Sequence, residues 1–118
     1  MANIDTLYKN QFGQMGSVFT SVDGAITPPS NRVFVAITFL AATTLDSSGG
    51  LVSDTSNDGV EFPSTQAAAH DAGAATAVSG TGGDQIDVND SFPAGVTIFG
   101  RWTSINVGTG MIIAYIGT

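Results

Sequence analysis

The sequence lacks cysteine and has few charged side chains. None of its 118 residues is Cys, so neither a disulfide framework nor a thiolate zinc site can form. Charged residues make up 11% of the chain, whereas an ordinary soluble domain has about 25%. Because 42% of the residues are hydrophobic, we expect a globular chain that owes its stability to packing.

Basic residues are the scarcest charged group. Lys9, Arg32 and Arg101 oppose ten acidic residues, which gives a formal net charge of -7. Three basic side chains cannot neutralise a row of phosphates, and they provide little attraction to anionic lipid. We therefore expect neither nucleic acid nor a membrane as a partner. A surface poor in charge and rich in Ser, Thr, Gly and Ala is instead suited to permanent contact with neighbouring subunits.

Short runs of β-branched and aromatic residues predict an all-β protein. The strongest strand is 32–41, and another at 96–105 is joined through a turn to 111–116, which indicates a hairpin. Further short strands are expected at 17–23, 51–53 and 85–88. We predict an antiparallel β-sandwich or a small, jelly-roll-like β-barrel with long loops rich in Gly, Ala and Ser.

The predicted body is a single β domain of residues 17–118, preceded by an N-terminal arm of residues 1–16. The start of the arm lacks the basic region and apolar core of a signal peptide. The arm is polar, but Tyr8 and Phe12 give it two aromatic side chains. We expect it to order on docking, and Tyr8 and Phe12 are therefore candidates for an interface.

Strict alternation along 32–41 assigns its two faces. One face, which we expect to point into the core, holds Val33, Val35, Ile37 and Phe39. Phe34 then falls on the opposite face, which mixes polar and apolar residues. Such a strand fits a sheet that is covered by the core on one side and by a neighbouring subunit on the other.

Trp102 and Arg101 admit two interpretations. In the first, both are exposed and bind a sugar or a partner. In the second, Trp102 belongs to the core and Arg101 pairs with an acidic residue of a neighbouring strand. We favour the second, because Trp102 shares its face with Val96 and Ile98. Arg101 lies on the other face, beside Phe99, where it is a further candidate for an intersubunit contact.

No catalytic residue or cofactor site is indicated, and we expect the chain not to be an enzyme. His70 is the only histidine. It lies in the Ala-rich run AAAHDAG, which has no strained nucleophile turn, so a loop histidine exposed to solvent is the better interpretation. The ten acidic residues show no spacing that singles out a pair for glycosidase chemistry.

The stretch 54–59 partly matches a calcium-binding loop. It offers oxygen ligands at the first, third and fifth places and Gly at the sixth, but the twelfth place, where a bidentate Glu is expected, is Thr65. An Asp-Asn-Gly cluster is more often a turn. We therefore predict no metal site, with Asp54 and Asp58 as the candidate ligands if one exists. The cluster Asp84, Asp87 and Asp90 is interpreted in the same way, as an acidic strand edge that deters pairing.

Several segments of the chain resemble small virion proteins of tailed bacteriophages. The similar segments are DGAITPP at 23–29, RVFVAITFL at 32–40, FPAGVTIFGRWTSI at 92–105 and MIIAYIG at 111–117. These segments shape the fold and contain no catalytic motif. The resemblance implies a head decoration, or cement, protein that forms a homotrimer and binds the major capsid protein. It also implies synthesis in the cytoplasm of the host bacterium and a final location in the virion.

Two other classes of function stay open. A receptor- or carbohydrate-binding module of a phage tail or fibre would need an exposed aromatic platform or a calcium site in its loops. A small hydrolase would need an organised site around His70. Capsid decoration is the function that we expect from the sequence.

Overall fold

The computed structural model describes residues 14–21, 24–46, 49–54, 62–65 and 85–118, and the structural statements below concern these residues. They form eight strands and no helix. The strands are β1 (Ser17–Thr20), β2 (Ala25–Ile26), β3 (Val33–Phe39), β4 (Thr43–Leu45), β5 (Leu51–Ser53), β6 (Ser91–Phe92), β7 (Thr97–Thr109) and β8 (Ile112–Gly117). The prediction of an all-β protein is confirmed. The described chain accordingly has no helix able to cross a membrane.

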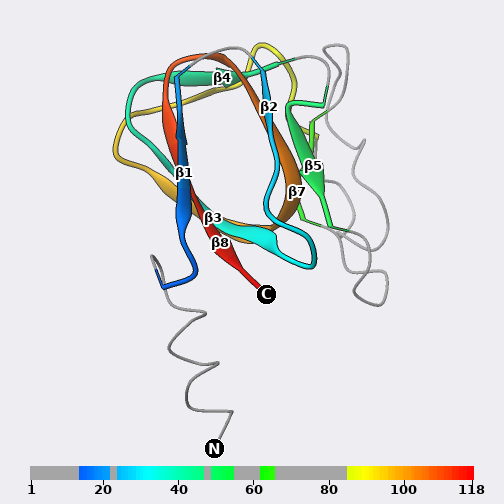
Figure 1. Ribbon diagram of the computed structural model, residues 1–118. Helices are drawn as coiled ribbons and strands as arrows, with labels where there is room; N and C mark the ends of the chain where they lie inside the picture. The colour runs from blue at the N-terminus through cyan, green and yellow to red at the C-terminus, as the bar shows by residue number, and fades with distance from the viewer. Residues whose placement is uncertain (1–13, 22–23, 47–48, 55–61, 66–84) are drawn as a thin grey trace, which may run out of the picture.

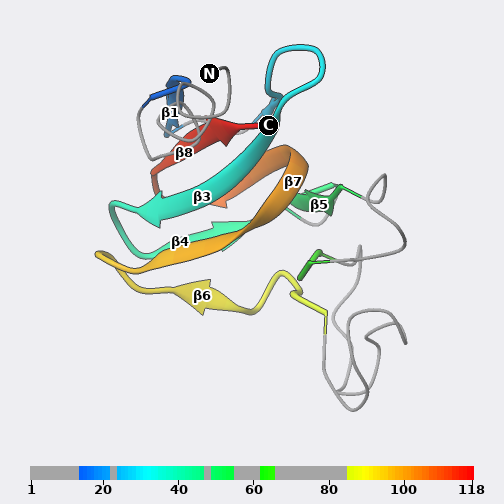
Figure 2. The same ribbon diagram turned by 90° about the horizontal axis from the view of Figure 1, so that it is seen from below.

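The strands pair antiparallel in a single open sheet with the order β1-β8-β3-β7-β4-β6, and β2 and β5 also pair with β7. Figure 2 shows β8 and β3 side by side, with β6 at the far end of the sheet. In Figure 1 the sheet bends around the core, so that β1 lies on one side and β7 on the other. Pairing with four strands makes the 13-residue β7 the centre of the fold.

The core fills the inner side of this bent sheet. Trp102 is fully buried and its indole Nε1–H donates a hydrogen bond to the main-chain oxygen of Pro63 at 2.8 Å. Phe39 is also fully buried and stacks on Phe92 of β6, with ring centroids 4.6 Å apart. The prediction that Trp102 belongs to the core is confirmed, and its one polar atom is satisfied, as a buried indole requires.

The alternation predicted for β3 is correct at Val33, Ile37 and Phe39, which are buried, and wrong at Phe34 and Val35. Ile37 and Phe39 lie in the core, but Phe34 joins them there, and Val35 is only half-buried. The pairing of β3 with β8 shifts register between Phe34 and Ala36. One extra residue in a strand reverses which side its neighbours face. This β-bulge therefore explains why Phe34, and not Val35, points inward.

The predicted hairpin between β7 and β8 is also wrong. The two strands are consecutive in the chain, yet β3 lies between them in the sheet and pairs with both. The second half of β7 pairs with β2, β4 and β5 instead. The turn at Gly110 therefore leads the chain to the far edge of β3.

Two other predicted strands differ in extent. The strand expected at 85–88 is reduced to one parallel bridge between Ile86 and Thr65, followed by a turn. The strand expected at 17–23 begins as predicted and ends at Thr20. Of the predicted arm, residues 1–13 lie outside the described residues. Its last residue, Gly16, accepts a hydrogen bond from the amide of Ile116 at 3.0 Å, which holds the end of the arm against β8.

Candidate functional site

The candidate site is the side of the sheet that faces away from the core. The register of β1, β8, β3 and β7 places two rows of residues on this side, because residues paired across antiparallel strands point the same way. The first row is Phe19, Ile113, Thr38 and Thr97, and the second is Ser17, Tyr115, Ala36 and Phe99. We call these residues the outer sheet face.

Two phenylalanines at opposite ends of the outer sheet face are strongly exposed. Phe19 on β1 is 59% exposed and Phe99 on β7 is 61% exposed. The other exposed large hydrophobic residues of the described chain lie between 37% and 41%. Between the two rings lie the half-buried Ile113 and the fully buried Ala36. These two rings are therefore the most exposed large apolar side chains of the described residues.

The eight residues of the outer sheet face are uncharged, although Arg101 lies on the same side of β7. Of the described aspartates, Asp46 follows β4, Asp87 and Asp90 precede β6, and Asp54 follows β5 and pairs with Arg101. The hydroxyl groups of Thr38 and Thr97 bond to each other at 2.8 Å. A partner that covers these eight residues therefore has no charged side chain to desolvate among them, which avoids one cost of a contact.

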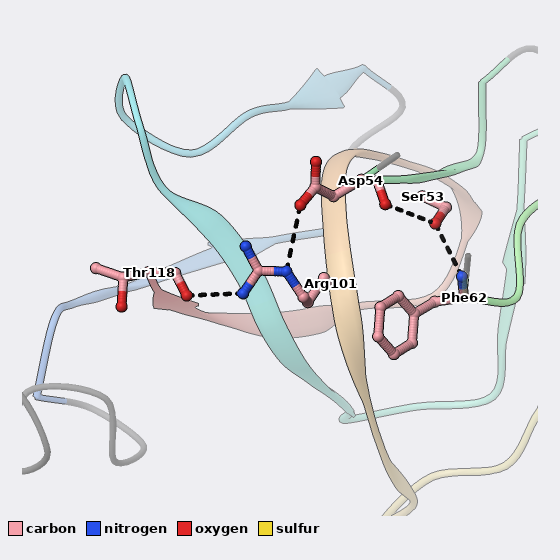
Figure 3. A network of polar contacts seen from close by, with 5 residues as sticks. All are labelled: Ser53, Asp54, Phe62, Arg101 and Thr118. Carbon is pink, nitrogen blue, oxygen red and sulfur yellow. Dashed lines mark hydrogen bonds and ion pairs between the residues drawn. The ribbon is translucent and has the colours of Figure 1, made fainter. Parts of the chain in front are cut away.

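Arg101 lies on the same side of β7 as Phe99, and its charge is held within the chain (Figure 3). Its Nε donates to Asp54 Oδ2 at 3.2 Å, and its Nη1 donates to the main-chain oxygen of Thr118 at 2.7 Å. The Asp54 side chain is 7% exposed and that of Arg101 is 29% exposed. The predicted pairing of Arg101 with an acidic residue is confirmed. Its role as an intersubunit contact stays a prediction.

Ser53 and Phe62 extend this network, as Figure 3 shows. The Ser53 hydroxyl donates to the main-chain oxygen of Asp54 at 3.3 Å and accepts from the amide of Phe62 at 2.9 Å. The phenyl ring of Phe62 meets Trp102 edge to face, with centroids 6.4 Å apart. The network therefore joins β5, β7 and the residue after β8, and its geometry indicates a structural role.

The candidate metal ligands are not brought together. Asp54 faces the guanidinium of Arg101, whose positive charge disfavours a cation at that carboxylate. Asp58 lies outside the described residues. Within the described ranges, no group of three or more His, Cys, Asp or Glu is placed to hold a metal ion.

Asp87 and Asp90 hold a turn. Asp87 Oδ1 accepts from the amide of Asn89 at 2.8 Å, and Asp90 Oδ2 accepts from the amide of Asp87 at 2.9 Å. An open depression of about 420 Å³ beside this turn is lined by Gln85, Ile86, Asp90, Ser91 and Phe92. Asp90 is the ionisable side chain of that lining, and the turn already uses one of its oxygens. Asp84, the third member of the predicted cluster, lies outside the described residues.

Tyr8, Phe12 and His70 also lie outside the described residues, so their predicted roles stay predictions. Sequence reasoning did not select the two residues that stand out in the structure, Phe19 and Phe99. The available signal was their position opposite the core residues in alternating strands. Alternation alone does not say whether the second side of a strand is covered.

The outer sheet face offers contact area and no reactive group. Burying exposed aromatic rings is favourable, and such rings are enriched at the centres of protein interfaces. Comparison with known proteins finds no matching family model, no matching curated protein and no matching solved structure. The geometry of this face, with the resemblance described above, is therefore the basis for a functional proposal.

Proposed function

We propose that the chain is a structural subunit of a tailed-phage virion, a head decoration or cement protein that works by packing against its neighbours. The observation that carries this proposal is the outer sheet face. It combines two strongly exposed phenylalanines with uncharged neighbours across the sheet, and the nearby charge of Arg101 is paired with Asp54. The resemblance of 23–29, 32–40, 92–105 and 111–117 to phage virion proteins supports the same class of function.

A decoration protein gains its binding strength from many repeated contacts. Each contact can be weak, because linked contacts raise the effective local concentration of the next one. A face of apolar and hydroxyl side chains suits this task, since it gives contact area without requiring one deep pocket. Phe19 and Phe99 are the groups whose burial contributes most, because large aromatic side chains dominate the energetics of interfaces.

An exposed Trp102 would have favoured the carbohydrate-binding alternative. Trp102 is fully buried and cannot serve as a stacking platform. Of the hydroxyl groups on the outer sheet face, those of Thr38 and Thr97 bond to each other and are thus less available to a sugar. A site for a polar ligand needs a few well-placed polar groups beside its apolar surface.

Binding to phage heads tests the proposal. Heads assembled without the chain are mixed with increasing amounts of the purified wild-type protein and sedimented, and bound protein is counted against the major capsid protein. We expect saturable binding at a fixed ratio, with density for the chain on the head surface in an electron cryomicroscopy map. Absence of binding to heads, together with density at the tail or with ligands on a glycan array, would reject decoration of the capsid.

A further inference from the structure

We propose that β1 accepts an extended, uncharged segment of the protein that the chain binds on the phage head, as an additional strand of the sheet. The main-chain groups of Ser17 and Phe19 receive this segment. The inference rests on the proposed function, because it names the kind of segment that is bound and the part of the chain that binds it. The contact is made by the edge of the sheet, next to the outer sheet face.

The two ends of the sheet differ in how they are protected against pairing. β6, at one end, has two residues and lies between Asp90 and Pro93. A short strand, a charge and a proline are usual means by which an edge strand avoids a further strand. β1, at the other end, has four residues, none of them Pro or charged, and its register with β8 has no bulge. β1 is therefore the end of the sheet that is suited to accept another strand.

Two residues of β1 direct their main-chain groups away from β8. The amide of Ile116 donates to the main-chain oxygen of Gly16 at 3.0 Å, which makes these two residues a hydrogen-bonded pair. Hydrogen-bonded and non-hydrogen-bonded pairs alternate along an antiparallel ladder, so Ser17 and Phe19 belong to non-hydrogen-bonded pairs. Their N–H and C=O groups therefore point to the other side of β1, where none of the described strands pairs with it. Residues two apart in a strand are separated by about 6.8 Å, which is the spacing that a further antiparallel strand needs.

The surroundings of β1 determine the chemistry of the segment. The described residues 14–21 are uncharged, so a charged side chain on the segment would find no opposite charge among them. An acidic segment would also be repelled by the net charge of -7. The residue that pairs with Phe19 places its side chain on the same side of the sheet, beside a ring that is 59% exposed. We therefore expect a β-branched or aromatic residue at that position of the segment.

The shortness of β1 determines how the segment is held. Main-chain hydrogen bonds supply the affinity when an extended peptide joins the edge of a sheet. Two residues with outward main-chain groups give a contact far below the roughly 800 Å² per partner of a standard interface. The segment must therefore belong to a partner that the chain also contacts elsewhere, because linked contacts reinforce one another. The surface of a phage head, which offers many contacts at once, meets this condition.

A proline variant tests the edge. Ser17→Pro removes the outward N–H of residue 17 and keeps the pairing with β8, because that N–H is not part of the β1–β8 ladder. Ser17→Ala is the matched control, since it keeps the N–H and loses only the hydroxyl group. Both are titrated onto phage heads assembled without the chain. We expect Ser17→Pro to bind about tenfold more weakly than Ser17→Ala, which corresponds to the loss of one main-chain hydrogen bond. Val52→Ala, an exposed site on β5, should bind like the wild type.

Amide hydrogen exchange on the wild-type protein decides the question even where circular dichroism shows that Ser17→Pro does not fold. We expect the amides of Ser17 and Phe19 to exchange several-fold more slowly on phage heads than in the free protein. Equal exchange in the two states, or equal binding by folded Ser17→Pro and Ser17→Ala, would overturn the inference and leave the proposed function intact. Heads that the wild-type protein leaves bare would instead reject the proposed function, and this inference with it.

Discussion

Aromatic residues on the two sides of the same sheet differ strongly in their exposure to solvent. Trp102 on the inner side of β7 is fully buried, and Phe99, three residues earlier on the outer side, is 61% exposed. Both are large and apolar, so their difference lies in what the rest of the chain places over them. Core residues of β3, β5 and β8 pack on the inner side, whereas Phe99 on the outer side keeps most of its surface exposed. This comparison predicts that inner residues determine folding and outer residues determine association.

The largest effect on stability should come from the inner side. Replacing Trp102 by Ala removes a fully buried side chain and its hydrogen bond to Pro63. We expect a loss of about 3–5 kcal/mol in the free energy of unfolding, measured by urea denaturation. Such a loss is a large share of the total stability of a small domain. A loss below about 1 kcal/mol would contradict the assignment of Trp102 to the core.

The next largest effect on stability should be a difference between the Ala variants of two glycines that both have positive φ. Gly110 and Gly95 both have positive φ, 102° and 88°, so Ala strains either backbone. A Cβ at Gly110 would clash with Thr43 Oγ1 and would lie 2.6 Å from the main-chain oxygen of Ala42, whereas one at Gly95 would meet nothing within 4 Å. We expect Gly95→Ala to cost about 1 kcal/mol and Gly110→Ala about 2–4 kcal/mol in thermal unfolding. Equal costs would show that steric contact at the β7–β8 turn is unimportant.

A smaller effect is expected from the network at the end of the outer sheet face. Arg101→Ala leaves the Asp54 carboxylate, whose side chain is 7% exposed, without its ion pair. We expect a loss of about 1–2 kcal/mol in unfolding free energy, reduced because Arg101 is itself partly exposed to solvent. Adding Asp54→Asn should recover part of this loss. Unchanged stability combined with weaker self-association would instead identify Arg101 as an intersubunit contact.

The smallest effect on folding should come from the outer side. Phe19→Ser and Phe99→Ser alter side chains that are more than half exposed, so each should change the unfolding free energy of the monomer by less than about 0.5 kcal/mol. The same substitutions should weaken binding to phage heads in the sedimentation assay. A destabilisation comparable with that of Trp102→Ala would show that these rings support the fold, and the contrast between the two sides would fail.

The features that the sequence predicted correctly are those that depend on the local alternation of residues along one strand. Alternation placed Trp102, Ile37 and Phe39 in the core, because a regular strand repeats its orientation every two residues. It failed at Val35, where a bulge inserts one residue and reverses the pattern. A local sequence carries no clear mark of a bulge, since the extra residue is defined by how the partner strands pair.

The elements that were predicted wrongly depend on distant parts of the chain. The turn at Gly110 is a valid hairpin signal, but β3, which precedes it by more than seventy residues, takes the place between β7 and β8. The exposure of Phe19 and Phe99 has the same origin. Whether a residue on the second side of a strand is covered depends on the tertiary arrangement, and composition could indicate only that some uncharged surface would exist.

The central claim is that Phe19 and Phe99 become covered when the chain assembles. Hydroxyl-radical footprinting of the wild-type protein, free and bound to phage heads, measures this coverage at each residue, with the exposed Met111 as an internal reference. We expect the reactivity of both phenylalanines to fall several-fold on assembly, while that of Met111 stays constant. Equal reactivity of Phe19 and Phe99 in the free and assembled protein would contradict the claim.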